Sequence, residues 1–461
     1  MTRIVIIGGG PGGYEAALVA AQLGADVTLV ERDGPGGACV LSDCVPSKTL
    51  IATSTRMAVM SESATLGVRF SGGPDGEVGG LGVDLQLTNK RVKELARAQS
   101  FDVAERLCYE DVRIVRGEAR FVDPQIIAVG DERLRADVVL VATGATPRVL
   151  PGAEPDGERI LSWRQLYDLP ELPENLIVVG SGVTGAEFAS AYQALGSRVT
   201  LVSSRDRILP TEDAAAATVL EEVFQRRGMN VLSRSRAARV ERSGDGVIVT
   251  LEDGRKVEGS HCLMTVGMVP NTAGIGLEEV GVQLDKRGFI KVDKVSRTNA
   301  SHIYAAGDCT GVLMLASVAA MQGRIAMWHS LGEAVQPLKL GWVAGNIFTD
   351  PEVATVGVSQ NMIDSGEVDA RTVMLPLNTN ARAKMQGFED GFVKLFCRPA
   401  TGIVLGGVIV APRASELILG LSVAVQQHLT VDQLAYTFTV YPSLSGSITE
   451  ASRRLMQESA F

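Results

Sequence analysis

Two stretches of this chain show the same succession of apolar runs and glycine turns. In the first, the apolar run Arg3–Ile7 is followed by the turn Gly8–Gly13, the helical run Tyr14–Leu23 and a second apolar run, Asp26–Val30. A short apolar run that ends in a glycine turn is typical of a buried parallel strand. The pattern predicts a strand–turn–helix–strand unit near the N-terminus.

The same succession recurs near residue 175. Leu176–Val179 predicts a strand, Gly180–Gly185 a turn, Ala186–Leu195 a helix and Arg198–Val202 the next strand. Two units of this kind predict an α/β chain with two Rossmann-like nucleotide-binding domains.

The rest of the chain gives a coarser pattern. Gly72–Leu87 is rich in glycine and predicts a loop, whereas Asn89–Tyr109 consists of strong helix formers. Short apolar runs predict strands at Val138–Val141 and Ile303–Ala306. Beyond residue 341 the pattern predicts an α+β C-terminal domain. Its strands are expected at Thr355–Val358, Phe392–Phe396 and Gly406–Val410, and its helices at Ser415–His428 and Ile448–Gln457.

Composition narrows the range of partners. The chain has 461 residues, of which 46% are hydrophobic and 21% charged, and a net charge of −9. This length predicts several domains, and the negative charge argues against nucleic acid as a partner. The first residues are typical of a strand rather than of a cleavable signal, and no apolar run reaches the ~18 residues of a membrane span. We therefore expect a cytoplasmic protein without integral membrane association.

The first glycine turn has the GxGxxG spacing of a dinucleotide site. Its glycines would let the backbone approach a pyrophosphate at the N-terminus of the following helix. An acid about 20 residues further on can accept hydrogen bonds from a ribose. The alternative is a tight structural turn, but the strands, the helix and the acid together favour a nucleotide site. Its residues are Gly8, Gly10, Gly12, Gly13 and Glu31.

The second turn has the same glycines but a different ending, in which Ser203-Ser204-Arg205-Asp206-Arg207 replaces the single acid. A carboxylate would repel the 2′-phosphate of NADPH, whereas hydroxyls and arginines can accept it. The alternative is that both arginines are solvated surface residues. We expect NADPH, with NADH possible, at Gly180, Gly182, Gly185, Ser203, Ser204 and Arg205.

Several motifs in the same order resemble the flavoprotein disulfide reductases, the family of dihydrolipoamide dehydrogenase and glutathione reductase. They are Gly36–Lys48 with its two cysteines, Ala142–Gly144, Gly267–Thr272 with Met268 where Arg is usual, Tyr304–Asp308 and Phe348–Glu352. The resemblance covers essentially the whole chain. It implies an FAD-binding domain (1–150), an NAD(P)-binding domain (151–275), a central domain that completes the FAD site (276–340) and an interface domain (341–461) that forms a homodimer.

The resemblance also implies a redox centre. Cys39 and Cys44 would form a disulfide, with Cys44 against the flavin, and Lys48 would pair with Glu187. The first helix turn after Cys44 and the Lys48 ammonium would lower the thiolate pKa. The alternatives are two packed, reduced cysteines or, less favoured, a zinc site; because a second cysteine pair and a nearby histidine are lacking, we expect no metal. Further cofactor contacts are expected at Gly37, Ala119, Thr143, Gly144, Gly267, Asp308 and Ala316.

One segment departs from the family, whose C-terminal HPTxxE motif supplies a His–Glu acid–base pair. Here Tyr441 occupies the His position and Gly446 the Glu position, and the last histidine is His428. Tyrosine stays protonated at neutral pH and is a poor base for a thiol. Glu450, one helical turn beyond, is a weak substitute. We expect Tyr441 to lie at the active site without replacing the histidine.

These observations favour a flavoprotein that transfers a hydride from NAD(P)H to FAD and then reduces a quinone. A quinone suits such a site because it accepts electrons without a thiol base supplied by the enzyme. The alternative is dihydrolipoamide dehydrogenase or another pyridine nucleotide-disulfide reductase with atypical acid–base residues. A third possibility is a catalytically idle binding subunit, against which the intact nucleotide and cysteine motifs argue.

Overall fold

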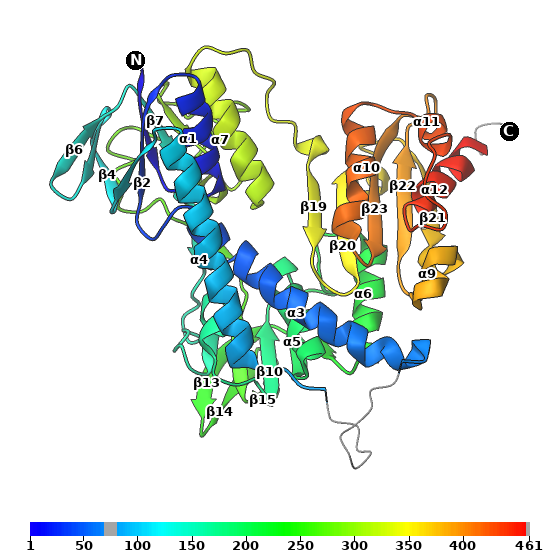
Figure 1. Ribbon diagram of the computed structural model, residues 1–461. Helices are drawn as coiled ribbons and strands as arrows, with labels where there is room; N and C mark the ends of the chain where they lie inside the picture. Colours follow the sequence, from blue (N-terminus) through cyan, green and yellow to red (C-terminus); the bar gives the residue numbers. More distant parts are fainter. Residues whose placement is uncertain (69–80, 458–461) are drawn as a thin grey trace.

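The computed structural model describes residues 1–68 and 81–457. Figure 1 shows two α/β units, one above the other, with the C-terminal domain beside them. Among the residues described, no helix is both long and apolar enough to cross a membrane.

The N-terminal unit is built on a parallel sheet with the strand order β18-β7-β1-β2-β3. The predicted bounds of β1 and β7 are confirmed, because both strands are almost wholly buried runs. The elements of this unit are β1 (Arg3–Ile7), α1 (Pro11–Gln22), β2 (Asp26–Glu31), α2 (Gly37–Leu41), α3 (Cys44–Glu62), η1 (Ser63–Leu66), α4 (Leu85–Tyr109), β3 (Arg113–Arg116), β4 (Ala119–Asp123), β5 (Ile126–Val129), β6 (Glu132–Arg135), β7 (Val138–Val141), β8 (Ala145–Pro147), β17 (Met268–Pro270), β18 (Ile303–Ala305), η3 (Asp308–Thr310) and α7 (Ala316–Ser330).

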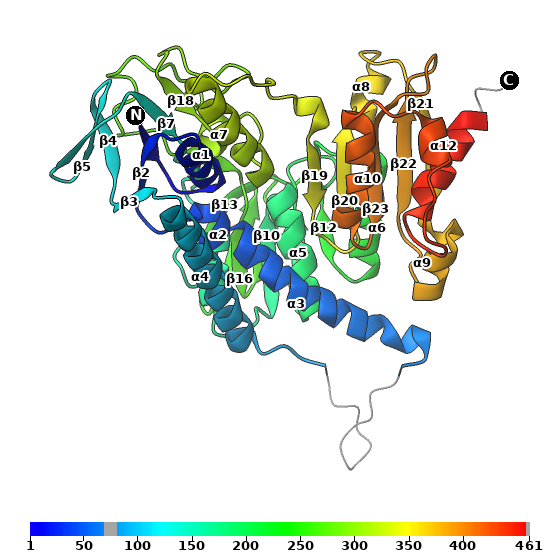
Figure 2. The same ribbon diagram turned by 45° about the horizontal axis from the view of Figure 1, so that its top comes forward.

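Helix α1 begins at Pro11, earlier than the predicted start at Tyr14. Proline suits a first helical position, since the N–H it lacks would have no partner within the helix. Gly12 lets α1 approach α7, because a Cβ there would come within 3.1 Å of the Ala306 Cβ and 3.2 Å of the Ala319 carbonyl oxygen. Figure 2 shows α1 and α7 side by side. This contact ties the chain beyond residue 303 to the first sheet.

The second unit has a parallel sheet of strand order β12-β11-β10-β16-β9. Its predicted elements are confirmed, although α5 begins at Val183 rather than Ala186. The elements are β9 (Ile160–Ser162), η2 (Trp163–Asp168), β10 (Asn175–Val179), α5 (Val183–Leu195), β11 (Arg198–Val202), α6 (Ala214–Arg226), β12 (Asn230–Leu232), β13 (Ala237–Ser243), β14 (Gly246–Leu251), β15 (Lys256–Gly259) and β16 (His261–Met264).

Each unit also carries a small antiparallel sheet that the sequence pattern did not predict, β4-β5-β6 in the first and β13-β14-β15 in the second. Their strands are short, and β14 alternates between buried and half-buried residues rather than forming an apolar run. Such strands give a weak signal in sequence, because only one face is buried.

The C-terminal domain is an antiparallel sheet of order β19-β20-β23-β22-β21, with α10 packed on β20 and β23 and α12 on β21 and β22. The predicted strands and helices are present with small shifts at their ends. The elements are η4 (Leu340–Trp342), β19 (Ala344–Ile347), β20 (Glu352–Gly357), α8 (Gln360–Asp364), β21 (Arg371–Pro376), η5 (Leu377–Thr379), α9 (Ala381–Gln386), β22 (Phe392–Cys397), β23 (Val404–Ala411), α10 (Ala414–Gln426), α11 (Val431–Ala435) and α12 (Gly446–Gln457).

Helix α3 crosses from the first unit toward the C-terminal domain and packs against α4 and α5 (Figure 1). One hydrophobic core includes Leu50 of α3, Phe188 of α5 and Phe396 of β22, so the three parts share buried side chains. The loop predicted for Gly72–Leu87 lies mostly outside the described residues. Its last three residues were wrongly predicted: they form the first turn of α4, because the Asp84 carboxylate caps this helix at the Leu87 N–H (2.9 Å).

Candidate active site

The first glycine turn leads from β1 into α1 in the way a dinucleotide site requires. Gly8 has φ +103°, and a Cβ on it would lie only 2.3 Å from the Ala142 carbonyl oxygen, so no other residue fits without rearrangement. Gly10 is the N-cap of α1, and Gly12 and Gly13 form its first turn. The free N–H groups and the positive end of this helix suit a pyrophosphate.

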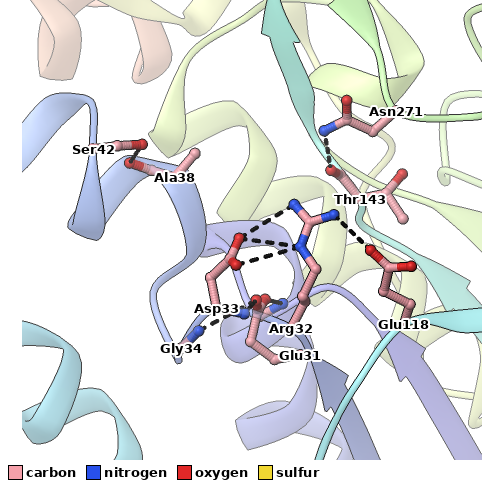
Figure 3. A network of polar contacts seen from close by, with 10 residues as sticks. Glu31, Arg32, Asp33, Gly34, Ala38, Ser42, Glu118, Thr143 and Asn271 are labelled. Atoms are coloured by element: carbon pink, nitrogen blue, oxygen red, sulfur yellow. Dashed lines mark hydrogen bonds and ion pairs between the residues drawn. The ribbon is translucent and has the colours of Figure 1, made fainter. Parts of the chain in front are cut away.

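Glu31 ends β2 beside this turn. Its Oε2 accepts a hydrogen bond from the Gly9 N–H (2.5 Å), and its Oε1 accepts one from the Asp33 N–H (2.7 Å). Figure 3 shows the network around it, in which the Arg32 guanidinium binds the carboxylates of Asp33 and Glu118. The carboxylate therefore lies next to the glycine loop, where the prediction of a ribose contact places it.

The remaining predicted FAD residues fall into three places. Gly37 opens α2 against the first turn, since a Cβ on it would be 2.9 Å from the Gly10 Cα. Thr143 and Gly144 follow β7, and both their carbonyl oxygens accept hydrogen bonds from Asn271. Ala119 begins β4, Gly267 directly precedes β17, Asp308 begins η3 and Ala316 begins α7.

An FAD molecule fits these residues. The close turn at Gly8 excludes a side chain, and α1 points its N-terminus at the turn. Burial, followed by the charge of Asp43, raises the pKa of Asp308 to about 6. A hydroxyl-bearing ligand beside Asp308 would restore the hydrogen bonds that burial removes.

The second glycine turn repeats this geometry between β10 and α5. Gly180 has φ +112°, and a Cβ on it would lie 2.3 Å from the Thr265 carbonyl oxygen; Gly182 is the N-cap of α5, and Gly185 lies in its first turn. The structure therefore brings all three predicted glycines to one helix N-terminus.

Beyond β11 the predicted phosphate-binding residues separate into two groups. Ser203 is fully buried. Its hydroxyl is hydrogen-bonded to the Ser181 hydroxyl (2.7 Å) and accepts a hydrogen bond from the Arg205 N–H (3.1 Å). Ser204 and Arg205 are exposed. Because the protein already occupies the Ser203 hydroxyl, Ser204 and Arg205 are the two of these predicted residues whose side chains remain accessible, and Ser203 shapes the turn that carries them.

The two cysteines lie next to each other at the junction of α2 and α3. Both are free thiols, Cys39 in α2 and Cys44 at the start of α3, and they are hydrogen-bonded to each other. This bond lowers the pKa of Cys44 against the opposing effect of burial, and Lys48 lowers it further. The same bond and burial raise the pKa of Cys39. The geometry therefore favours a thiolate on Cys44 and a thiol on Cys39.

Lys48 and Glu187, predicted to pair, are in contact. The Lys48 Nζ lies 2.8 Å from the Glu187 Oε2, and the other carboxylate oxygen accepts the Phe348 N–H (2.9 Å). The side chain of Glu187 is only 4% exposed. Burial disfavours the charge on Lys48, but Glu187 outweighs it and raises the pKa of Lys48. One carboxylate thus joins α3, α5 and the chain beyond β19.

The sequence analysis missed an acid in this centre, Asp43, which directly precedes Cys44. Asp43 is the N-cap of α3, yet its side chain makes no capping hydrogen bond. Burial raises the pKa of Asp43, with Lys48 and Arg164 acting against it and Glu187 with it. The sequence does show an acid between the two cysteines. Its charged neighbours on η2 and α5, however, are far from Asp43 in the sequence, so no local pattern singles this acid out.

The C-terminal segment is arranged differently. Tyr441 is 85% exposed and makes no hydrogen bond with any residue that the structure describes. Gly446 begins α12, and the Glu450 carboxylate on this helix is hydrogen-bonded to Arg453 (2.8 Å) and Arg454 (3.2 Å), which lowers its pKa. Figure 2 shows α2 and α12 at opposite sides of the molecule, with the strands of the C-terminal sheet between them. Within one chain, this segment does not reach the cysteines.

Two glycine turns at helix N-termini and a cysteine–lysine–glutamate centre define a class of protein, and comparison with known proteins agrees. Residues 2–323 match the pyridine nucleotide-disulphide oxidoreductase family, and residues 343–452 match the dimerisation domain of that family. The chain belongs to this family, which confirms the resemblance and the fold inferred from the sequence.

Within this family, the chain is similar to the following individual proteins. The chain is 57% identical to a protein of Mycobacterium tuberculosis named NAD(P)H dehydrogenase (quinone), over 99% of this chain and 94% of that one. It is 34% identical to dihydrolipoyl dehydrogenase of Chlorobaculum parvum, over 98% and 97%. Its fold matches the crystal structure of LpdA from M. tuberculosis with a TM-score of 0.93, at 57% identity, covering 99% of this chain and all of the other.

Proposed function

We propose that this protein is an FAD-dependent NAD(P)H:quinone oxidoreductase. The observation that carries the proposal is the contrast between a complete, buried redox centre and a C-terminal segment with Tyr441 and Gly446 in place of the acid–base pair. The name of the M. tuberculosis relative, NAD(P)H dehydrogenase (quinone), supports the same acceptor class. The more distant dihydrolipoyl dehydrogenases represent the alternative, a disulfide reductase with atypical acid–base residues.

The residues of the chain have distinct parts in this reaction. FAD, held by the first glycine turn and Glu31, would take a hydride from the nicotinamide and pass two electrons to the acceptor. Glu187 fixes the Lys48 ammonium beside the cysteines, where a permanent cation stabilises developing negative charge. Cys39 and Cys44 can exist as a dithiol or a disulfide, but reduction of a quinone by the flavin would not require them. NADPH is favoured over NADH, because Ser204 and Arg205 replace an acid at the end of β11.

The C-terminal segment supports a homodimer. Tyr436, Phe438, Val440 and Tyr441 are all more than three-quarters exposed, which is unusual for neighbouring large apolar side chains. We propose that a second copy of the chain covers them and that Tyr441 reaches its partner's redox centre. A cytoplasmic location, where reduced nicotinamides are available, completes the proposal.

The test is steady-state oxidation of NADPH and NADH by the purified flavoprotein with benzoquinones, naphthoquinones, lipoamide and glutathione disulfide as acceptors. We expect kcat/KM to be larger for a quinone than for lipoamide. A larger value for lipoamide would reject the proposal in favour of the disulfide reductase. Lack of bound flavin after purification would favour the idle subunit.

A further inference from the structure

Strand β22 of the C-terminal domain is a buried, apolar strand with one lysine in it. Lys394 lies on the same face as Phe392 and Phe396, which belong to a hydrophobic core that also contains Phe224 of α6. The Lys394 side chain is only 7% exposed. An ammonium in such a place requires a partner of opposite charge, because taking the charge out of water is costly.

The partner of Lys394 comes from the second unit. Its Nζ lies 2.7 Å from the Asp213 Oδ2 and 3.0 Å from the Oδ1, and the Asp213 side chain is 3% exposed. Asp213 is also the N-cap of α6, where the Oδ1 accepts hydrogen bonds from the N–H groups of Ala215 (3.0 Å) and Ala216 (3.1 Å). These two bonds cap the helix without the lysine. One carboxylate therefore joins the start of α6 to β22, and α6 lies next to the C-terminal sheet in Figures 1 and 2.

Asp213 ends the segment 203–213, which carries the residues predicted to bind the nucleotide phosphate. In this segment Leu209 is fully buried at φ +46°, a left-handed conformation that is uncommon for a residue with a side chain. The Leu209 N–H donates to the carbonyl oxygen of Ser181 in the second glycine turn (2.8 Å), and its own carbonyl accepts the Glu212 N–H (3.0 Å). A continuous series of contacts thus runs from the glycine turn through the segment to Asp213 and the lysine of the other domain.

Stability alone does not explain this ion pair. Apolar side chains in place of a buried ion pair often leave stability unchanged or increase it. The two domains already share an apolar core on this face, and α6 has another attachment at its other end, where Arg226 binds Asp390. Lys394 adds a fixed position for the start of α6, and with it for the end of the segment 203–213.

We propose that Lys394 is a positioning residue for the nicotinamide nucleotide. By holding Asp213, it fixes the segment 203–213 against the second glycine turn, so that Arg205 and the turn bind the adenosine end of one nucleotide together. A residue of the C-terminal domain would thus set the affinity of the NAD(P) site without touching the nucleotide. The inference rests on the nucleotide site proposed at the second glycine turn, but not on the acceptor.

The experiment measures the binding of NADP+ and NAD+ to the oxidised, FAD-loaded enzyme by titration calorimetry. Lys394→Met keeps an apolar stem of similar length and removes the charge. We expect the Kd for NADP+ to rise about tenfold, within the range for residues coupled through a shared partner. The flavin absorbance, and kcat with saturating NADPH and a benzoquinone, should change little, because the redox centre is untouched. A variant that was merely destabilised would lose flavin and kcat as well.

A double variant keeps the test decisive if Lys394→Met does not fold. Lys394→Met with Asp213→Asn leaves no unpaired buried charge and does not alter the net charge of the chain, and asparagine still caps α6. We expect the same rise in Kd. The matched control is Arg226→Ala, which breaks an exposed contact between the same helix and the same domain, and its Kd should equal that of the unmodified enzyme.

Two results would overturn the proposal: an unchanged Kd in the double variant with FAD bound, or an equal rise in Arg226→Ala. The proposed preference for NADPH fails separately. If the unmodified enzyme binds NAD+ more tightly than NADP+, that preference is rejected, and the Kd for NAD+ in the double variant decides whether Lys394 positions the segment.

Discussion

The residues around the two cysteines and the residues of the C-terminal segment differ in how far they contact the rest of the chain. At the cysteines, Lys48, Glu187 and Phe348 form a closed set of contacts between three parts of the fold, with the carboxylate almost fully buried. At the C-terminal segment, Tyr441 is exposed and Glu450 is bound to its own helix. The side chains around the cysteines thus come from one subunit, whereas the segment that carries the acid–base pair in the family has Tyr441 and Gly446 in its place.

The largest effect is expected when the ion pair between Lys48 and Glu187 is broken. Glu187→Ala leaves the Lys48 ammonium buried without its partner and removes the acceptor of the Phe348 N–H. We expect a loss of about 3 kcal/mol in the free energy of unfolding, as is usual when one member of a buried pair is removed. Denaturant-induced unfolding of the purified protein measures it.

The control lies on the exposed side. Arg453→Ala removes an ion pair with Glu450 on the surface of α12, and such pairs contribute little. Its unfolding midpoint should stay near that of the unmodified protein. Equal losses in the two variants would show that the buried pair has no special structural role.

The second prediction restores what the C-terminal segment lacks. Tyr441→His together with Gly446→Glu should raise kcat/KM for lipoamide by about 10²-fold, the usual contribution of a positioned acid–base group. The structure has room for the change, because a Cβ at Gly446 would meet only the Ser443 hydroxyl, at 3.7 Å, in the described part of the chain. Quinone reduction should change little.

The matched control is Tyr441→Phe, which removes the hydroxyl but adds no base, and should affect neither acceptor strongly. If the double variant gains no lipoamide activity while retaining flavin and dimer, the missing acid–base pair is not what limits dithiol chemistry.

The smallest effect is expected at the edge of the second nucleotide site. Arg205→Ala should raise KM for NADPH about tenfold, as the loss of a charge-assisted hydrogen bond predicts, and leave KM for NADH nearly unchanged. Arg234→Ala is the matched control, because its guanidinium is exposed and already bound to Asp206 (2.8 Å). Equal changes for both nucleotides in Arg205→Ala would mean that this residue does not contact the 2′-phosphate.

The sequence predicted most of this fold because the central strands of the two parallel sheets, β1, β7 and β10, are largely apolar runs that lead to glycine-containing turns. It located β1 and β7 correctly, whereas it missed the strands β4–β6 and β13–β15, most of which are short or alternate between buried and more exposed residues. The helix starts were placed too late, since Pro11 and Val183 precede the apolar periodicity that signals α1 and α5.

The candidate site was predicted to the extent that its residues carry recognisable spacing. The Lys48–Glu187 contact came from a family resemblance and joins helices far apart in sequence. The burial of Ser203 depends on the Ser181 hydroxyl, and the surroundings of Asp43 depend on Arg164 and Glu187. No local pattern encodes these contacts, because they arise from how η2, α3 and α5 pack.

The most direct test of the account is the activity of Cys44→Ser with its flavin bound. If electrons leave reduced flavin for a quinone without passing through the cysteines, this variant keeps most of the quinone kcat/KM of the unmodified enzyme and loses both the charge-transfer absorbance and any lipoamide activity. Double-reciprocal plots for NADPH and quinone should remain parallel. Abolition of quinone reduction with FAD still bound would make the disulfide an obligatory relay and contradict the account.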